Sequence, residues 1–180
     1  MRRPGNQSNA RDARLQRLAD RIDALAEKDE KLVRYSRDMA ALREAAAVEL
    51  HAICREFVNS VNRLLSRGEL TLDPAEFLRE RFVEEGANLF QIGIRGRILQ
   101  IEFAATAELV STEEFRVPYT LSGSVRAFNQ ELLDQDLIEE QLLFYTIEHE
   151  KKMWRFFDAR TYRSGAFDRE YLIGVMEQLI

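Results

Sequence analysis

The chain has 180 residues and a net charge of −5, a size that corresponds to one domain with an extension. Residues 1–67 hold 14 Lys/Arg against 10 Asp/Glu (+4), whereas residues 68–180 hold 12 against 21 (−9). Phosphate contacts need clustered Lys and Arg, so the acidic second part argues against a nucleic-acid partner. The single cysteine, Cys54, excludes an internal disulfide and fits a reducing compartment.

The sequence shows no signal for a membrane or for export. No apolar run approaches the ~18 residues that a membrane span needs. Residues 1–14 begin with basic side chains but lack the apolar region of a secretory signal. We therefore expect a cytoplasmic protein without a membrane span.

A long helix is the first predicted element after a flexible basic tail at residues 1–7. The segment 8–67 contains no Gly or Pro and is rich in good helix formers, so we expect one helix that begins with a cap at Ser8 or Asn9 and ends before Gly68. A helix of that length measures about 90 Å, more than the width of a domain formed by residues 68–180. Its first half is therefore expected to lie outside that domain.

Apolar residues follow a seven-residue repeat along this helix, which favours supercoiling with a second helix. One position of the repeat is apolar throughout: Leu18, Leu25, Leu32, Met39, Ala46 and Ile53. Its companion position turns polar in the middle: Leu15, Ile22, Asp29, Ser36, Arg43, Leu50, Phe57 and Leu64. The predicted oligomer interface, most simply that of a homodimer, comprises Leu15, Leu18, Ile22, Leu25, Leu32 and Met39.

Beyond Ala46 the apolar face widens, as in a helix that packs on a globular core. Its members are Leu50, Ile53, Cys54, Phe57, Val58, Val61, Leu64 and Leu65. An alternative is a helix broken near Asp29–Glu30 that folds back as a hairpin, although no Gly or Pro marks such a break.

A second helix is expected from Asp73 to Gly86, after a short strand at residues 70–72. Asp73 has the character of an N-cap, with Pro74 at the first helical position and Glu76 completing a capping box. Phe77, Leu78, Phe82 and Val83 would form its buried face.

The remaining segments predict an antiparallel sheet and a final helix. A hairpin at 88–103 turns at Arg95–Gly96 and places Phe90, Ile92, Leu99 and Ile101 on one face. Further strands are expected at 115–121, at 124–132 after a turn at Ser122–Gly123, at 137–147 and at 153–158, whereas 129–141 fits helix and strand equally well. Asp168 would cap the last helix, whose apolar face is Tyr171, Leu172, Val175, Met176, Leu179 and Ile180.

These elements indicate an α+β fold. It combines the long N-terminal helix, coiled-coil-like in its first half, with an antiparallel sheet of five to six strands, a short second helix and a C-terminal helix. The domain plan is therefore a tail at 1–7, the helix at 8–67 and an α+β domain at 68–180.

Candidate sites are few. His51 and Cys54 share a helix face, but Cys54 lies in the widest apolar stretch, where cysteine acts as a small hydrophobe. Glu148, His149 and Glu150 fit a charged hairpin tip better than a metal site. We therefore assign no catalytic residue, no cofactor and no metal ligand.

One segment mixes cations with aromatic rings and is a candidate ligand or partner surface. Its residues are Lys151, Lys152, Trp154, Arg155, Arg160, Tyr162 and Arg163. The competing interpretation is that Trp154 fills the core while residues 158–163 form a loop held by ion pairs.

The leading functional hypothesis is a non-enzymatic assembly protein. It would self-associate through the N-terminal helix and dock a protein partner on its acidic domain. The alternative is a small-molecule or lipid-binding module with an apolar cavity between sheet and helix, lined by Phe57, Phe90, Ile92, Ile101 and Phe103. An enzyme ranks third, because no acid–base constellation is visible in the sequence.

Overall fold

A computed structural model describes residues 6–129 and 139–180 of the chain. In chain order the elements are α1 (Asn6–Asn62), β1 (Thr71–Asp73), the 3₁₀ helix η1 (Arg79–Arg81), β2 (Asn88–Ile94), β3 (Arg97–Val110), β4 (Tyr119–Phe128), β5 (Glu139–Glu148), β6 (Lys151–Asp158), β7 (Arg163–Ala166) and α3 (Arg169–Leu179). The chain divides into two compact units, Met1–Ala41 and Leu42–Ile180, which are described separately.

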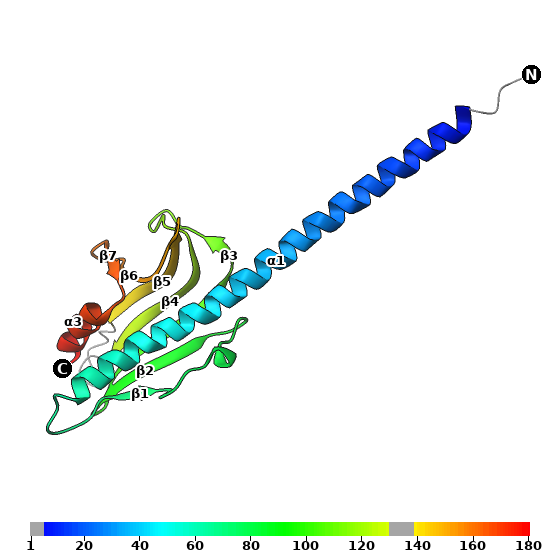
Figure 1. Ribbon diagram of the computed structural model, residues 1–180. Helices are drawn as coiled ribbons and strands as arrows, with labels where there is room; N and C mark the ends of the chain where they lie inside the picture. Colours follow the sequence, from blue (N-terminus) through cyan, green and yellow to red (C-terminus); the bar gives the residue numbers. More distant parts are fainter. Residues whose placement is uncertain (1–5, 130–138) are drawn as a thin grey trace, which may run out of the picture. The chain divides into compact units, whose positions relative to one another are not determined.

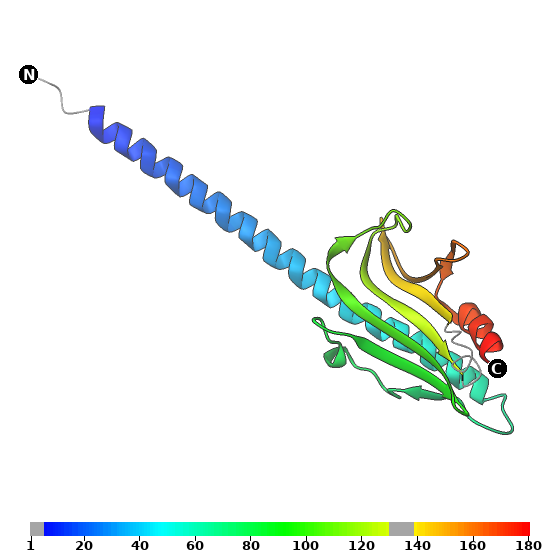
Figure 2. The same ribbon diagram turned by 180° about the vertical axis from the view of Figure 1, so that it is seen from behind.

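The second unit confirms the α+β prediction. Its described strands form one antiparallel sheet in the order β1 to β7, with seven strands rather than the predicted five to six. The sheet is curved, and α3 and the part of α1 that starts at Leu42 lie on its concave face (Figures 1 and 2). Each strand pairs with the next along the chain, so the sheet is an uninterrupted meander.

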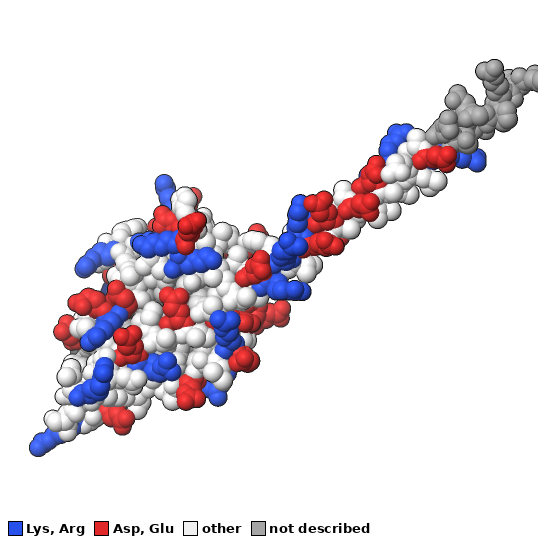
Figure 3. All heavy atoms as spheres, in the orientation of Figure 1, with Lys and Arg blue, Asp and Glu red and all other residues white. Residues whose placement is uncertain are grey.

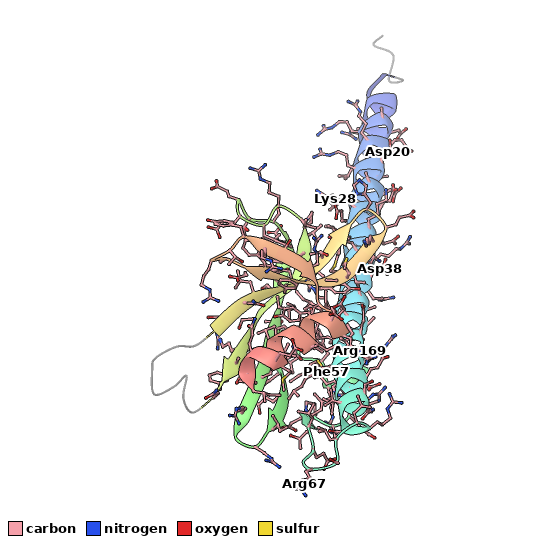
Figure 4. All side chains as sticks on the ribbon, turned by 90° about the vertical axis from the view of Figure 1, so that its left-hand side faces the viewer. Asp20, Lys28, Asp38, Phe57, Arg67 and Arg169 are labelled. Carbon is pink, nitrogen blue, oxygen red and sulfur yellow. The ribbon has the colours of Figure 1, made fainter. Side chains whose placement is uncertain are left out.

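The core lies between this concave face and the two helices. On α1 the buried residues recur with helical spacing: Ala46, Ala47, Leu50, Cys54, Phe57 and Val58. Phe57 is labelled in Figure 4, and its side chain is 3% exposed. The indole Nε1–H of Trp154 donates to the Ala46 carbonyl oxygen at 2.8 Å, so the largest buried side chain of the sheet also fixes the helix by a hydrogen bond.

The end of α1 differs from the prediction. The helix ends at Asn62, five residues before the expected end at Arg67. The Asn62 side chain bonds both the N–H and the carbonyl oxygen of Leu70, at 2.8 and 2.9 Å, and so holds the returning chain against the helix end. Leu64, expected in the buried face, is 85% exposed as a result.

The hairpin between β2 and β3 has the predicted register. Ile94 pairs with Arg97, Ile92 with Leu99 and Phe90 with Ile101. Arg95 and Gly96 both have positive φ, 45° and 82°, as a type I′ turn requires. All four residues of the predicted face, Phe90, Ile92, Leu99 and Ile101, are fully buried.

The predicted second helix is wrong: only the single 3₁₀ turn η1 forms between Asp73 and Gly86. Asp73 is the last residue of β1 and pairs with Gln91 instead of capping a helix. The Pro74 carbonyl oxygen accepts from His51 Nε2 at 2.8 Å, and the Asn88 side chain bonds both backbone polar groups of Val83. One distant side chain, His51, and one nearby side chain, Asn88, thus satisfy backbone groups that a helix would pair internally.

The predicted turn at Ser122–Gly123 is also wrong, because β4 runs straight through it from Tyr119 to Phe128. A Cβ at Gly123 would lie 1.9 Å from the Glu102 carbonyl oxygen and 2.7 Å from Phe103 Cα. Gly123 therefore permits the close approach of β3 to β4 instead of forming a turn. Phe115, expected at the start of this strand, lies in the preceding loop.

The C-terminal elements largely follow the prediction. β5 and β6 are present, and Asp168 caps α3 by accepting from the Tyr171 N–H at 3.0 Å. Two details differ: β7 was not foreseen, and Ile180 is 72% exposed. The parts of the predicted strands and of the ambiguous segment that fall on residues 130–138 lie outside the described residues.

The described part of the first unit is helical, and residues 11–38 are exposed. α1 continues without a break through Asp29–Glu30, so the hairpin alternative is wrong. The helix already includes Asn6 and therefore begins before the expected caps, whereas residues 1–5 of the predicted tail lie outside the described residues.

Two glycines test the packing of the sheet. We expect Gly123→Ala to lower the free energy of unfolding by about 2 kcal/mol or more, because its Cβ would clash with the backbone of β3. Gly174→Ala is the control: it lies within α3 with no atom within 4 Å of the new Cβ, and we expect it to stabilise the protein by about 0.5–1 kcal/mol. Urea unfolding of the two variants measures both; equal effects would contradict the assignment of Gly123.

Candidate functional site

The predicted oligomer interface lies on an exposed face of α1. Five of its residues have more than half of their surface in solvent: Leu15 (64%), Leu18 (53%), Ile22 (57%), Leu25 (62%) and Leu32 (57%). Their spacing of three and four residues places them on one side of the helix. Met39, the sixth, is half-buried. We name these six residues the heptad face.

Polar contacts within the first unit lie away from the heptad face. Lys31 Nζ is 2.7 Å from Glu27 Oε1, and Gln16 Nε2 donates to Asp20 Oδ1 at 3.0 Å. These i, i+4 pairs occupy the opposite side of the helix. Figure 3 shows charged and uncharged side chains interspersed along this segment, and Figure 4 labels Asp20, Lys28 and Asp38 on it. Among the described residues of this segment, these polar contacts leave the heptad face uncovered.

Arg43 follows Asp29 and Ser36 at the polar position of the seven-residue repeat, but it lies in the second unit and is buried. Its guanidinium donates to Thr120 Oγ1 at 2.7 Å and to the Thr106 carbonyl oxygen at 2.6 Å, and it pairs with Glu84. The cation is thus satisfied by the sheet and by the segment before β2.

The candidate ligand surface of residues 151–163 is divided by the alternation of β6. Trp154 is 1% exposed and belongs to the core, so it is not accessible to a ligand. Lys151, Lys152, Arg160, Tyr162 and Arg163 are exposed, and Arg155 is half-buried with its Nη1 3.9 Å from Glu148 Oε2. The structure therefore keeps these six cationic and aromatic side chains near the surface, and their role as a ligand or partner surface stays a prediction.

Asp158 organises the loop that carries three of them. Its carboxylate accepts from the Arg160 N–H at 2.9 Å. That backbone hydrogen bond, followed by hydrogen bonds from Thr161 and the charge of Arg160, lowers the pKa of Asp158 below its ordinary value. The loop is thus held mainly by hydrogen bonds to the Asp158 carboxylate, and the ion pair that the competing interpretation expected is present as a longer contact of 3.7 Å between Arg160 Nε and Asp158 Oδ1.

His51 and Cys54 are both parts of the core. His51 is 3% exposed, bonds the Pro74 carbonyl oxygen and stands edge-on to Phe90 with ring centroids 5.2 Å apart. Burial raises the pKa of the Cys54 thiol to about 12, so the reactive thiolate is suppressed at neutral pH. These contacts give both side chains structural roles.

His149 and Glu150 form the tight turn between β5 and β6, with His149 at a φ of 56°. Across the part of the chain that the structure describes, no three His, Cys, Asp or Glu side chains are grouped to hold a metal ion.

The space between sheet and helix is filled by side chains. Phe57, Phe90, Ile92, Ile101 and Phe103 were the expected lining of an apolar cavity there. Each is at most 3% exposed, and ring centroids lie 5.3 Å apart both between Phe90 and Phe103 and between Phe103 and Trp154. Such edge-on contacts are typical of a closely packed core.

A hollow of about 700 Å³ lies instead on the opposite, outer face of the sheet. Small side chains form its floor: Ala104, Ser122 and Ser124. Aromatic side chains form one wall: Phe115, Tyr119, Phe144 and Phe157. At the other end Arg126 lies between Glu102 and Glu140, at 3.7 and 3.1 Å.

Sequence reasoning missed this hollow because its lining comes from four strands and a loop. The pairing of Ser122 with both Ala104 and Phe144 places small and large residues side by side on the outer face. The small residues Ser122 and Ser124 at alternate positions of β4 were the available signal, but they become meaningful only when the strand order is known.

Comparison with known protein families, curated sequences and solved structures gives no match to this chain. Among the described residues, no helix has both the length and the apolar character that crossing a membrane requires.

The loop at Asp158 gives a pH-dependent prediction. Because the pKa of Asp158 is lowered on folding, its carboxylate stabilises the protein above the ordinary value of 3.8, and this contribution is lost as the pH falls through the lowered folded pKa. We therefore expect Asp158→Asn to melt below the wild type at pH 7, and the difference in melting temperature to shrink towards pH 2.5. Melting curves between these pH values test this, and a difference that does not change with pH would contradict it.

Proposed function

We propose that this chain is an assembly protein that forms a homodimer through the heptad face and presents its second unit to a protein partner. The exposure of the heptad face is the observation that carries the proposal. Five large aliphatic side chains in one line, each more than half exposed, are costly in water unless another surface covers them.

A second copy of the same helix is the partner that fits this face best. Its apolar residues recur every seven residues, the period at which two helices keep a common seam. The polar companions Asp29 and Ser36 weaken the seam but restrict which registers are acceptable. A globular partner would place no such requirement on the period.

The second unit is the candidate for partner docking. Residues 68–180, which make up most of this unit, carry a charge of −9, from 12 Lys/Arg against 21 Asp/Glu. In Figure 3 acidic and basic side chains are interspersed over the face of this unit that is in view. Its net charge favours association with a basic protein, and steering by charge would raise the association rate at low salt.

Self-association is tested with substitutions in the full chain. We expect the double variant Leu25→Glu/Leu32→Glu to be monomeric by size-exclusion chromatography with light scattering, while the wild type is dimeric. Charges placed in the seam would have to be buried without a partner, which strongly opposes association. Arg34→Glu introduces the same side chain on the opposite face of the helix and should leave the dimer intact. A monomeric wild type, or equal effects of the two variants, would contradict the proposal.

The outer-face hollow supports a second candidate function, the binding of a small organic cation. Its volume of about 700 Å³ is in the range of small-molecule sites. Among the described residues that line it, four are acidic, Glu102, Glu113, Glu114 and Glu140, and one is basic, Arg126. A ligand with an aromatic body and an ammonium group would match both the charge and the aromatic wall.

Phenethylammonium is a probe for this second candidate, and 2-phenylethanol is its uncharged counterpart. We expect millimolar phenethylammonium, but not the alcohol, to raise the melting temperature. Ser122→Leu fills the floor of the hollow and should abolish the shift, whereas Ser66→Leu in an exposed loop should not. Equal shifts with both compounds, or a shift that survives Ser122→Leu, would contradict this function.

A further inference from the structure

We infer that the two helices of the proposed dimer run parallel and in register, with Asp29 of each copy facing the partner subunit's Lys28. This inference rests on the proposed self-association and adds the orientation of the helices. It follows from the side chains that border the heptad face.

The two borders of the heptad face differ in chemistry. In the heptad notation Leu15, Ile22, Asp29 and Ser36 occupy position a, and Leu18, Leu25, Leu32 and Met39 occupy position d. Position g then forms a basic edge: Arg14, Arg21 and Lys28. Position e forms an apolar edge: Ala19, Ala26 and Val33. All six edge residues are exposed and therefore accessible to a second helix.

An antiparallel pair would bring like edges together. Position g of one helix then lies beside position g of the other, so Arg21 would meet the partner subunit's Lys28. No acidic side chain occupies a g position between residues 14 and 35 to relieve the repulsion. Since the residues at e and g set the orientation of paired helices, the basic edge disfavours this arrangement.

A parallel pair instead brings the basic edge beside the partner's apolar edge, so the cations at position g do not face one another. Leucine at d together with Ile22 at a is typical of parallel two-stranded coiled coils. The long methylene stems of Arg21 and Lys28 can also cover Ala26 and Val33 of the neighbouring helix while their charges stay in water.

Asp29 fixes the register. In a parallel pair, a g side chain lies next to the following a position of the partner, so the partner subunit's Lys28 is beside Asp29. A shift of one heptad would set Asp29 against the partner subunit's Ile22 and leave an apolar residue opposite a carboxylate. Only the unshifted pair places apolar layers together and polar layers together. Its Asp29 layer holds one carboxylate from each copy, with the Lys28 ammonium groups of both copies beside it to offset their repulsion.

Substitution of Lys28 distinguishes the two orientations by the sign of its effect. In a parallel dimer Lys28→Glu places a carboxylate beside the partner subunit's Asp29, and we expect the dissociation constant to rise by about tenfold or more. In an antiparallel dimer the same change would relieve repulsion and lower the dissociation constant. Lys31→Glu is the control. Lys31 pairs with Glu27 on the side of the helix opposite the heptad face, so its substitution should change the dissociation constant little.

Disulfide trapping gives an independent measurement. Both variants carry Cys54→Ser. Isotope-labelled chains with Leu18→Cys are mixed with unlabelled chains with Ser36→Cys, and the mixture is oxidised with a glutathione buffer, so that the mass of each crosslinked pair identifies its two chains. A parallel, in-register dimer gives 18–18 and 36–36 crosslinks, whereas an antiparallel dimer gives 18–36 crosslinks and would overturn the inference. Leu18→Cys mixed with Leu25→Cys tests the register, since 18–25 crosslinks would indicate a shift of one heptad. A monomer before oxidation would contradict self-association itself and not only the orientation.

Discussion

The burial of the second half of α1 against the curved sheet is the interaction on which the second unit depends. Ala46, Ala47 and Leu50 are fully buried, and the Trp154 indole reaches the Ala46 carbonyl oxygen across the interface. Small side chains on the helix let the sheet approach closely, so β2 to β6 each contribute large apolar residues to one core. The sheet needs this helix because its concave face is too apolar to remain in water.

The same helix carries two apolar surfaces with different chemistry. Beyond Ala46 the face is wide and is covered by the chain's own sheet, whereas the heptad face is narrow and exposed. Arg43 lies between them in sequence and is bonded to Thr120, Thr106 and Glu84. Any other placement of the helix on the sheet would leave the buried Arg43 guanidinium without these three partners, which is costly. Arg43 therefore fixes where on the helix the packing against the sheet begins.

The two faces of the sheet are covered differently. α1 and α3 both lie on the concave face (Figures 1 and 2), whereas the loop before β4 contributes Phe115 to the other face. Phe115, Tyr119 and Phe144 form a small second core there, with ring centroids of Phe115 and Phe144 4.5 Å apart. Beside it the small residues of β3 and β4 leave space unfilled, which distinguishes this face from the packed side.

The sequence by itself determined the features that depend on local spacing. These are the long helix, the widening of its apolar face at Ala46, the register of the 88–103 hairpin and the Asp168 cap, since period, turn chemistry and capping act within a few residues. Only the tertiary structure decided the conformation of Asp73–Gly86, where the pairing of Asp73 with Gln91 and the hydrogen bond from His51 to Pro74 replace a helix. It also decided the role of Gly123, which depends on how closely β3 passes. The hollow likewise required the strand order, because residues distant in sequence become neighbours only through pairing. Local rules fail at such positions because the competing partners are far away in the chain.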